Sequence, residues 1–312
     1  SKPDLKALRQ KLMRRRWPLA LGWVAFLAGL TTAQVLLSHD QQKAPPQAVR
    51  SLEPTPLPLG AGEDPLDRPL VAAPLPGLEE TTGEGQLPVI GPDGQAPLRA
   101  YAAPFNRADP RPRLSIVLTG VGLQTAPLNE ALRRLPGAVV LAFSAHTPGL
   151  GKALAAAREG GHEIMLEVPS DRLDAVVGDD PGPGALRRAL SAGENIQRLH
   201  LMMGRGSGYV GFILSPNSWA NEDPNLGGAL LSEAQKRGLL MLTSSDALAG
   251  LGQSQGSPVL SRTLALDRDL TPEGVDAALA ELEQRAREAG QGVAVSPAYP
   301  LVLEKLKDWL PG

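Results

Sequence analysis

Short apolar runs rich in β-branched residues recur along residues 113–312, and segments with helical spacing lie between them. Apolar runs bounded by turn residues indicate strands. Seven strands are predicted, at 114–118, 139–143, 163–168, 209–214, 239–242, 259–260 and 293–295. Helices are predicted at 126–134, 149–158, 185–203, 227–237, 272–289 and 301–309. This alternation indicates a parallel sheet covered by helices, and seven strands suit a barrel, although the pattern also allows an open sheet.

An uncharged apolar stretch near the start of the chain predicts a membrane anchor at 17–38. From Trp17 to Leu37 there are 21 residues without a charge, which is about the length that crosses roughly 30 Å of hydrocarbon. Residues 1–16 carry seven Lys or Arg and one acid, Asp4. The positive-inside bias therefore predicts a cytoplasmic N-terminus and an exported remainder. A signal peptide cleaved after 31–33 is the alternative, and the apolar run that continues to Leu37 speaks against it.

Proline marks the next segment, residues 39–112, as a linker. These residues contain 15 of the 30 prolines and very few aromatic residues. This composition favours extended backbone and buries too little apolar area to fold, so we expect a disordered tether. The end of the segment, 98–105, is the piece that we expect to dock on the domain at 113–312.

Composition excludes several classes of function. A net charge of −2 and a pI near 6.1 give no global electrostatic case for binding nucleic acid. The chain has no cysteine, which excludes disulfides, a thiolate nucleophile and a Cys-ligated metal.

Few of the residues that follow the predicted strands could act as acids, bases or metal ligands. The first strand runs into Thr119 and Gly120, and later strands run into Ser and Pro. An enzyme built from strand-helix repeats keeps its acids, bases and metal ligands at the carboxyl ends of its strands. A zinc site also needs three protein ligands, usually His or carboxylate. We expect neither a metal nor any other cofactor.

Histidine offers one candidate for such a site. His146 follows a predicted strand, so we expect it to point toward the mouth of the fold. His162 precedes its strand, at the wrong end for a ligand, and we expect it to be a hydrogen-bonded turn residue. His200 lies in a predicted helix and has no partner at helical spacing, which indicates a structural or exposed role.

Carboxylates are densest around the third predicted strand. Glu167 lies near its end, and Asp171, Asp174 and 179–180 follow. A catalytic pair in a cleft is one interpretation. The favoured interpretation is a solvated acidic loop, because no second acid is placed to oppose it. Asp246 follows a later strand and is the other candidate.

One tryptophan lies among amides in a loop at the expected mouth. Trp219 is flanked by Asn217 and Asn221. Sugar rings stack on such side chains while amides bond their hydroxyls. A tryptophan that caps the fold or contacts another protein is the equal alternative.

Several segments, taken in order, resemble the divergent polysaccharide deacetylase family of bacterial envelopes. They include LSIVLTGVG at 114–122, LPGAVVLAFSAHTP at 135–148, GHEIMLEVP at 161–169, DPGPG at 180–184 and VAVSPAYPLVLEKLKDWL at 293–310. The resemblance spans essentially all of 113–312. It implies an α/β fold, a deformed seven-stranded β/α barrel, which the predicted transmembrane helix and linker precede.

The resemblance also implies where the catalytic base and metal ligands would lie. An acid pair ends the family's first strand, a His-containing segment ends the fourth, an Asp-Ser-Arg segment follows the fifth, and two histidines lie near the end of the domain. The matching positions here are Thr119, Gly120, Ser215, Thr243, Pro297 and Tyr299. None of these residues is an acid or a histidine, so the resemblance implies a degenerate site.

Three hypotheses follow for function. The first is a single-pass protein of the bacterial inner membrane with a periplasmic, non-hydrolytic barrel that binds envelope carbohydrate or a protein partner. The second is a hydrolase with a rearranged site built from His146, Glu167 and Asp246. The third is an interaction subunit of an inner-membrane envelope complex.

Overall fold

The computed structural model describes residues 69–312, apart from 106–108, 124, 177, 263 and 311–312. The predicted anchor at 17–38 and the first part of the linker lie outside the described residues. Within the described part of the chain, no helix is both long enough and apolar enough to cross a bilayer.

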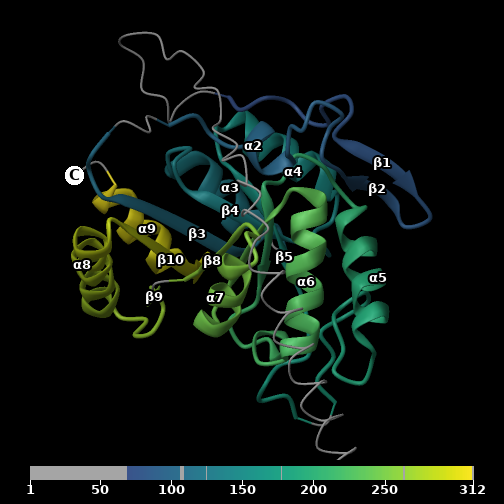
Figure 1. The fold of residues 1–312 in the computed structure, drawn as a ribbon. Helices are drawn as coiled ribbons and strands as arrows, with labels where there is room; N and C mark the ends of the chain where they lie inside the picture. Colours follow the sequence, from purple (N-terminus) through teal and green to yellow (C-terminus); the bar gives the residue numbers. More distant parts are fainter. Residues whose placement is uncertain (1–68, 106–108, 124, 177, 263, 311–312) are drawn as a thin grey trace, which may run out of the picture. The chain divides into compact units, whose positions relative to one another are not determined.

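A curled parallel sheet of eight strands forms the centre of the domain (Figure 1). Its order is β8-β7-β6-β5-β4-β3-β10-β9, and every neighbouring pair is parallel. The strands are β3 (Arg113–Val121), β4 (Val140–Ser144), β5 (Ile164–Val168), β6 (Gly211–Leu214), β7 (Leu240–Thr243), β8 (Val259–Ser261), β9 (Leu264–Ala265) and β10 (Gln291–Pro297).

The two edge strands of this sheet are consecutive in the chain. β8 pairs with β7, whereas β9, which begins three residues after β8 ends, pairs with β10. No backbone ladder joins β8 to β9 among the described residues. The prediction of seven barrel strands is therefore corrected to a half-barrel of eight. The difference arises because one predicted strand at 259–260 is followed by a second, two-residue strand that its apolar pattern did not reveal.

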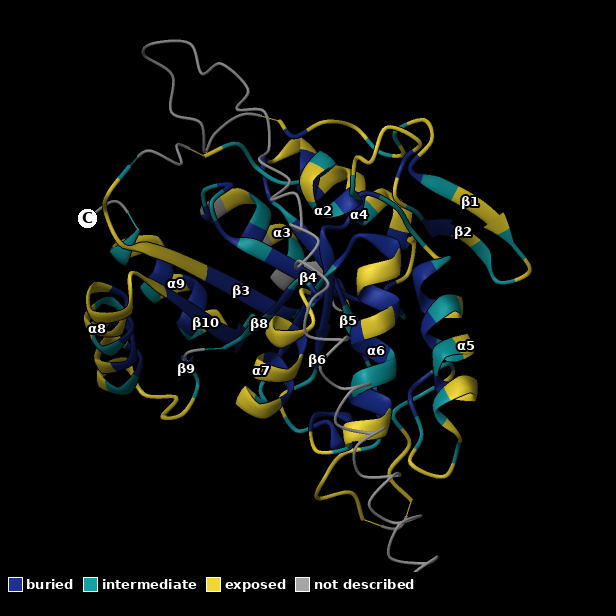
Figure 2. Ribbon diagram, viewed as in Figure 1, coloured by how far each residue is buried: buried dark blue, intermediate teal, exposed yellow. Residues whose placement is uncertain are grey.

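Helices cover one face of the sheet. They are α3 (Thr125–Arg134), α4 (Leu150–Glu159), α5 (Ala192–Met203), α6 (Pro224–Arg237), α7 (Asp246–Ser254), α8 (Pro272–Ala289) and α9 (Pro300–Trp309). Figure 2 shows that the strands are largely buried, while helices such as α6 expose one side.

Two helices on this face differ most from the sequence prediction. α5 begins at Ala192 rather than at 185, because Ser191 caps it. The Ser191 hydroxyl accepts a hydrogen bond from the Glu194 N–H, and the Glu194 carboxylate accepts one from the Ser191 N–H. α7 was not predicted, since its glycines lower helix propensity. Ser245 nevertheless caps it by accepting from the Leu248 N–H.

Alternate residues of each strand enter two separate hydrophobic cores. Ile116 and Leu118 pack with the helices, whereas Val117 packs on the opposite, inner face of the curl. The other strands alternate in the same way, and their inner-face residues include Ala142, Met165, Ile213, Leu242 and Val295.

Residues 69–105 pack against the inner face near the residues that precede the strands, rather than forming a disordered linker. They contain β1 (Glu79–Thr82), β2 (Gly85–Pro88) and α2 (Pro97–Ala100), and β1 and β2 form an antiparallel hairpin. Leu78 and Tyr101 are buried in the inner core. The expected docking of 98–105 is confirmed. The packed segment also includes residues 69–97, because Leu78 and Leu87 are buried in the two hydrophobic cores.

Candidate functional site

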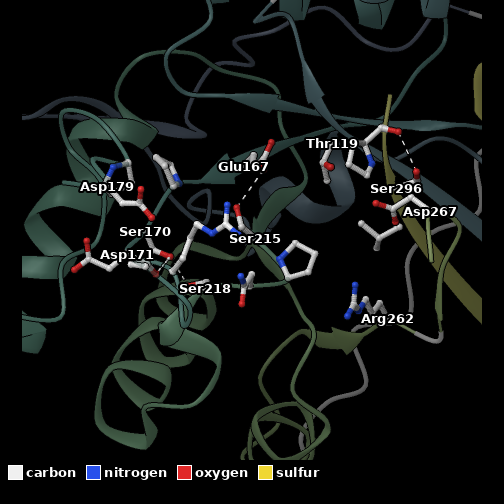
Figure 3. Close-up of a pocket in the computed structure, with 18 of the residues that line it drawn as sticks. Thr119, Glu167, Ser170, Asp171, Asp179, Ser215, Ser218, Arg262, Asp267 and Ser296 are labelled. Atoms are coloured by element: carbon white, nitrogen blue, oxygen red, sulfur yellow. Dashed lines mark hydrogen bonds between the residues drawn. The ribbon is translucent and has the colours of Figure 1, made fainter. Parts of the chain in front are cut away.

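A cavity of about 690 Å³ opens at the carboxyl ends of the central strands (Figure 3). Its floor, the strand-end floor, consists of Thr119, Glu167, Ser215 and Ser296, from or directly after β3, β5, β6 and β10. One wall is the 169–181 segment after β5. The other wall contains Arg262 and Asp267.

Strand alternation explains which residues reach this cavity. Thr119, Glu167 and Ser215 each lie two positions after an inner-face residue of the same strand: Val117, Met165 and Ile213. Side chains two apart in a strand point to the same face. These three residues therefore continue the inner core toward the carboxyl ends of the strands, where two hydroxyls and one carboxyl replace its apolar side chains. Ser296 instead follows Ala294 of the outer core and is fully buried, and its hydroxyl donates to the Pro297 carbonyl.

Glu167 lies at the centre of the floor (Figure 3). Its Oε2 accepts a hydrogen bond of 2.8 Å from the Gly120 N–H, and its Oε1 accepts one of 3.2 Å from the Ser215 hydroxyl. Burial raises the pKa of this carboxyl above its ordinary value, while the two hydrogen bonds act in the opposite direction. Gly120 adopts a φ of +68°, a conformation that favours glycine.

The acids after Glu167 form a separate network along the 169–181 wall. Asp171 accepts from the Arg187 guanidinium at 3.2 Å and from the Arg188 N–H at 2.7 Å. Asp180 also pairs with Arg187. Asp174 is exposed and pairs with Arg172 at 2.9 Å. The acidic-loop interpretation describes these aspartates, whereas Glu167 belongs to the floor.

The positions transferred by resemblance divide into two groups. Thr119, Ser215 and Pro297 line the cavity, and Gly120 contributes its N–H to Glu167. Thr243 and Tyr299 are not among the lining residues.

Thr243 has the wrong strand parity for the cavity, because its neighbour Leu242 faces the inner core. Its hydroxyl instead donates to the Asn221 Oδ1 at 2.6 Å. Tyr299 precedes α9 and is 40% exposed.

The candidates His146 and Asp246 lie outside the cavity. The His146 Nε2 lies 2.6 Å from the Pro183 carbonyl oxygen, beside a separate hollow. Asp246 is exposed in the first turn of α7. The grouping of His146, Glu167 and Asp246 into one rearranged site is therefore wrong.

Trp219 caps the fold instead of offering a stacking surface. The residue is 5% exposed, its Nε1 has no hydrogen-bond partner, and the Arg188 guanidinium lies 5.8 Å from the ring centroid. Its neighbour Asn217 does line the cavity, where its amide donates to Asp174.

The other two histidines of the described residues are structural, as expected. His162 is buried, with Nδ1 2.8 Å from the Val139 carbonyl oxygen. The His200 Nε2 lies 2.6 Å from the Glu233 Oε1.

Six polar residues of the cavity were not singled out from the sequence: Ser170, Arg172, Ser218, Arg262, Asp267 and Ser296. Ser296 could have been found as the neighbour of Pro297. Arg262 lies in the break between β8 and β9 and Asp267 follows β9, so their position depends on an edge strand too short to leave a pattern.

Residues 116–312 match the family model described as divergent polysaccharide deacetylase, which is more than half of the chain. The chain belongs to the divergent polysaccharide deacetylase family. The resemblance read from the sequence is thereby confirmed.

A solved structure extends the similarity beyond this family match. The crystal structure of the uncharacterized protein ATU2773 from Agrobacterium tumefaciens C58 is similar, with a TM-score of 0.67 and 32% identity, over 72% of this chain and 92% of that one. Because 72% of 312 residues is more than 116–312 contains, the similarity reaches into the residues before 116. No curated protein matches this chain.

The cavity residues of this divergent polysaccharide deacetylase domain do not fit a metal ion of the kind that the resemblance implies. Among the described residues, no group of three His, Cys, Asp or Glu could hold one. Glu167 is the carboxylate of the strand-end floor, and its neighbours there are hydroxyls. A zinc site takes three His or carboxylate ligands, so this donor set falls short.

Proposed function

We propose that this domain is a non-hydrolytic member of the divergent polysaccharide deacetylase family that binds envelope glycan in its strand-end cavity. One observation carries the proposal. The cavity persists at the carboxyl ends of the strands, while the positions that would hold base and metal ligands there are Thr119, Gly120, Ser215 and Pro297.

The chemistry of the cavity supports a polyhydroxylated ligand. The hydroxyls of Thr119 and Ser215 and the amide of Asn217 line it together with Glu167. Such groups both donate to and accept from sugar hydroxyls. A volume of about 690 Å³ lies within the range of ordinary ligand sites, roughly 300–1,000 Å³.

Filling the cavity tests this proposal. Ala175 is exposed and lines the 169–181 wall, so Ala175→Trp places an indole in the cavity without disturbing a core. We expect the full chain in detergent to bind envelope oligosaccharides and Ala175→Trp to bind them at least about tenfold more weakly, or roughly 1.4 kcal/mol. Isothermal titration calorimetry measures both affinities.

The matched control is Ala247→Trp, which adds the same side chain at an exposed position of α7 outside the cavity. This variant should bind like the wild type. Equal affinities for all three proteins, or an absence of glycan binding by the wild type, would sink the proposal. So would stoichiometric zinc or cobalt in the purified protein together with acetate release from an acetylated glycan.

We further propose that the domain is tethered to the bacterial inner membrane and lies in the periplasm. The uncharged stretch 17–37 and the basic residues before it support this placement. A reporter fused at the C-terminus that is active only outside the cytoplasm should be active. Activity of a cytoplasm-specific reporter instead would overturn the placement.

The second candidate function is an interaction subunit of an inner-membrane envelope complex. Exposed apolar side chains near the cavity, Leu173 and Val176, favour it. Pull-down of the detergent-solubilised chain should then recover a fixed partner, and Leu173→Ser with Val176→Ser should lose it. Recovery of the chain alone speaks against this candidate.

A further inference from the structure

The charge balance of the cavity indicates which saccharide it takes. Along the 169–181 wall, Asp171 and Asp180 share Arg187, and Arg172 pairs with Asp174. These contacts join three aspartates to two arginines, so this wall keeps one negative charge in excess.

The opposite wall has one charge of each sign. Arg262 and Asp267 both line the cavity, and neither side chain has a hydrogen bond or ion pair within the described residues. Figure 3 shows the two on the same side of the cavity, away from Asp179. Their opposite charges cancel across this wall.

Two further carboxylates line the cavity. Asp179 accepts a hydrogen bond from the Val176 N–H and interacts electrostatically with Arg172. Glu167 lies on the floor between the two walls, and its two donors are the neutral groups of Gly120 and Ser215. Five acidic residues and two arginines line the cavity, so acidic groups are in excess, and Glu167 is the one on the floor.

Glu167 also retains capacity for further donors. A carboxylate offers about four acceptor positions, and two of those of Glu167 are used by described residues. Because burial without a cation disfavours the ionised form, a cationic donor from a ligand is the partner that this carboxylate lacks. An ammonium group brings both the charge and three N–H donors.

We propose that the cavity binds a saccharide unit with a free, protonated amine, whose ammonium group contacts the Glu167 carboxylate and whose hydroxyls contact Thr119 and Ser215. This inference rests on the proposed glycan-binding function and deepens it. An N-acetylated sugar lacks the charge and presents a carbonyl acceptor to an acceptor, so it binds more weakly here.

A matched pair of ligands tests the inference. The β-1,4-linked tetrasaccharide of glucosamine and its fully N-acetylated counterpart differ in the acetyl groups alone. At about pH 6, below the pKa of a typical amine, we expect the full chain in detergent to bind the glucosamine form at least about tenfold more tightly. Titration calorimetry gives both dissociation constants.

Two substitutions assign this preference to Glu167. Glu167→Gln keeps the size and the acceptor for the Gly120 N–H but removes the charge, so it should bind both tetrasaccharides with similar affinity. Asp246→Asn removes the same charge from an exposed position outside the cavity. It should keep the wild-type preference.

The outcomes separate the two proposals. If neither tetrasaccharide nor any other envelope glycan binds, the glycan-binding function itself fails. If both tetrasaccharides bind the wild type equally, if the acetylated form binds better, or if Glu167→Gln retains the preference, the amine inference is overturned while glycan binding stands.

Discussion

At the scale of single residues, the alternation of side chains along a strand decides which polar groups reach the cavity. Thr119, Glu167 and Ser215 share the face of Val117, Met165 and Ile213, and they meet at the cavity. Thr243 lies one position out of phase and bonds Asn221 instead. All of these residues are named in the sequence predictions, but there Glu167 is grouped with the acids that follow it. Counting by two along its strand would have separated Glu167 from that loop.

Glu167 should cost the domain stability at neutral pH. Its folded pKa lies above the ordinary value of 4.5, so the folded state binds the proton more tightly than the unfolded state. The stabilising contribution is full below the unfolded pKa and is lost as pH rises through the folded pKa. At neutral pH the buried carboxyl therefore makes the domain less stable than it is below pH 4.5.

We therefore predict that Glu167→Gln is more stable than the wild type at pH 7 by roughly 0.5–2 kcal/mol, the usual size of a stabilising substitution. The difference should shrink as pH falls through the folded pKa toward 4.5 and stay constant below it. Thermal unfolding followed by circular dichroism over this pH range measures it. An unchanged difference at every pH would contradict the titration argument.

At the scale of elements, the segment 69–105 is held by side-chain bonds to the helices and loops of the half-barrel. Arg158 of α4 is 2% exposed and donates to the carbonyls of Val71, Tyr101 and Gly208, at 2.9–3.1 Å. Its guanidinium also lies 5.1 Å from the centroid of the Tyr101 ring. One buried side chain thus connects three points of the chain.

Replacing Arg158 by Ala should destabilise the domain by at least about 2 kcal/mol, because it leaves buried carbonyls without donors. Arg158→Lys should recover part of this loss, since one ammonium cannot reproduce the planar donor geometry. Chemical denaturation measures both. The control is Arg205→Ala, at an exposed position. If Arg158→Ala matches that control, Arg158 does not hold the segment.

The elements show where sequence prediction succeeds and where it ends. All seven predicted strands exist, because continuous apolar runs such as 114–118 need no tertiary information. β9, at Leu264–Ala265, was missed because two residues show no period. The hairpin was missed because prolines dominate its surroundings, and its leucine, Leu87, is buried by a core that the rest of the chain supplies. The cavity followed from the strand ends, whereas Arg262 and Asp267 depended on the missed edge.

At the scale of the whole molecule, the domain has two hydrophobic cores that are completed by different parts of the chain. The helices complete the outer core, but no residue of α3–α9 enters the inner core. That core is completed by Leu78 and Tyr101, with further contacts from Ala73, Leu75 and Leu98. The family match begins at residue 116, yet the folding unit begins before it.

This closure predicts the boundary of the stable domain. A chain cut to 69–312 should unfold in one cooperative transition, because it retains both cores. A chain cut to 113–312 exposes Val117, Met165 and Ile213 along the inner face and leaves Arg158 without two of its three carbonyl partners. We expect it to aggregate or to bind a hydrophobic dye. Adding residues 69–105 as a separate peptide should reduce the dye signal; a scrambled peptide is the control. A monomeric, cooperatively folding 113–312 chain would show instead that the inner core closes without this segment.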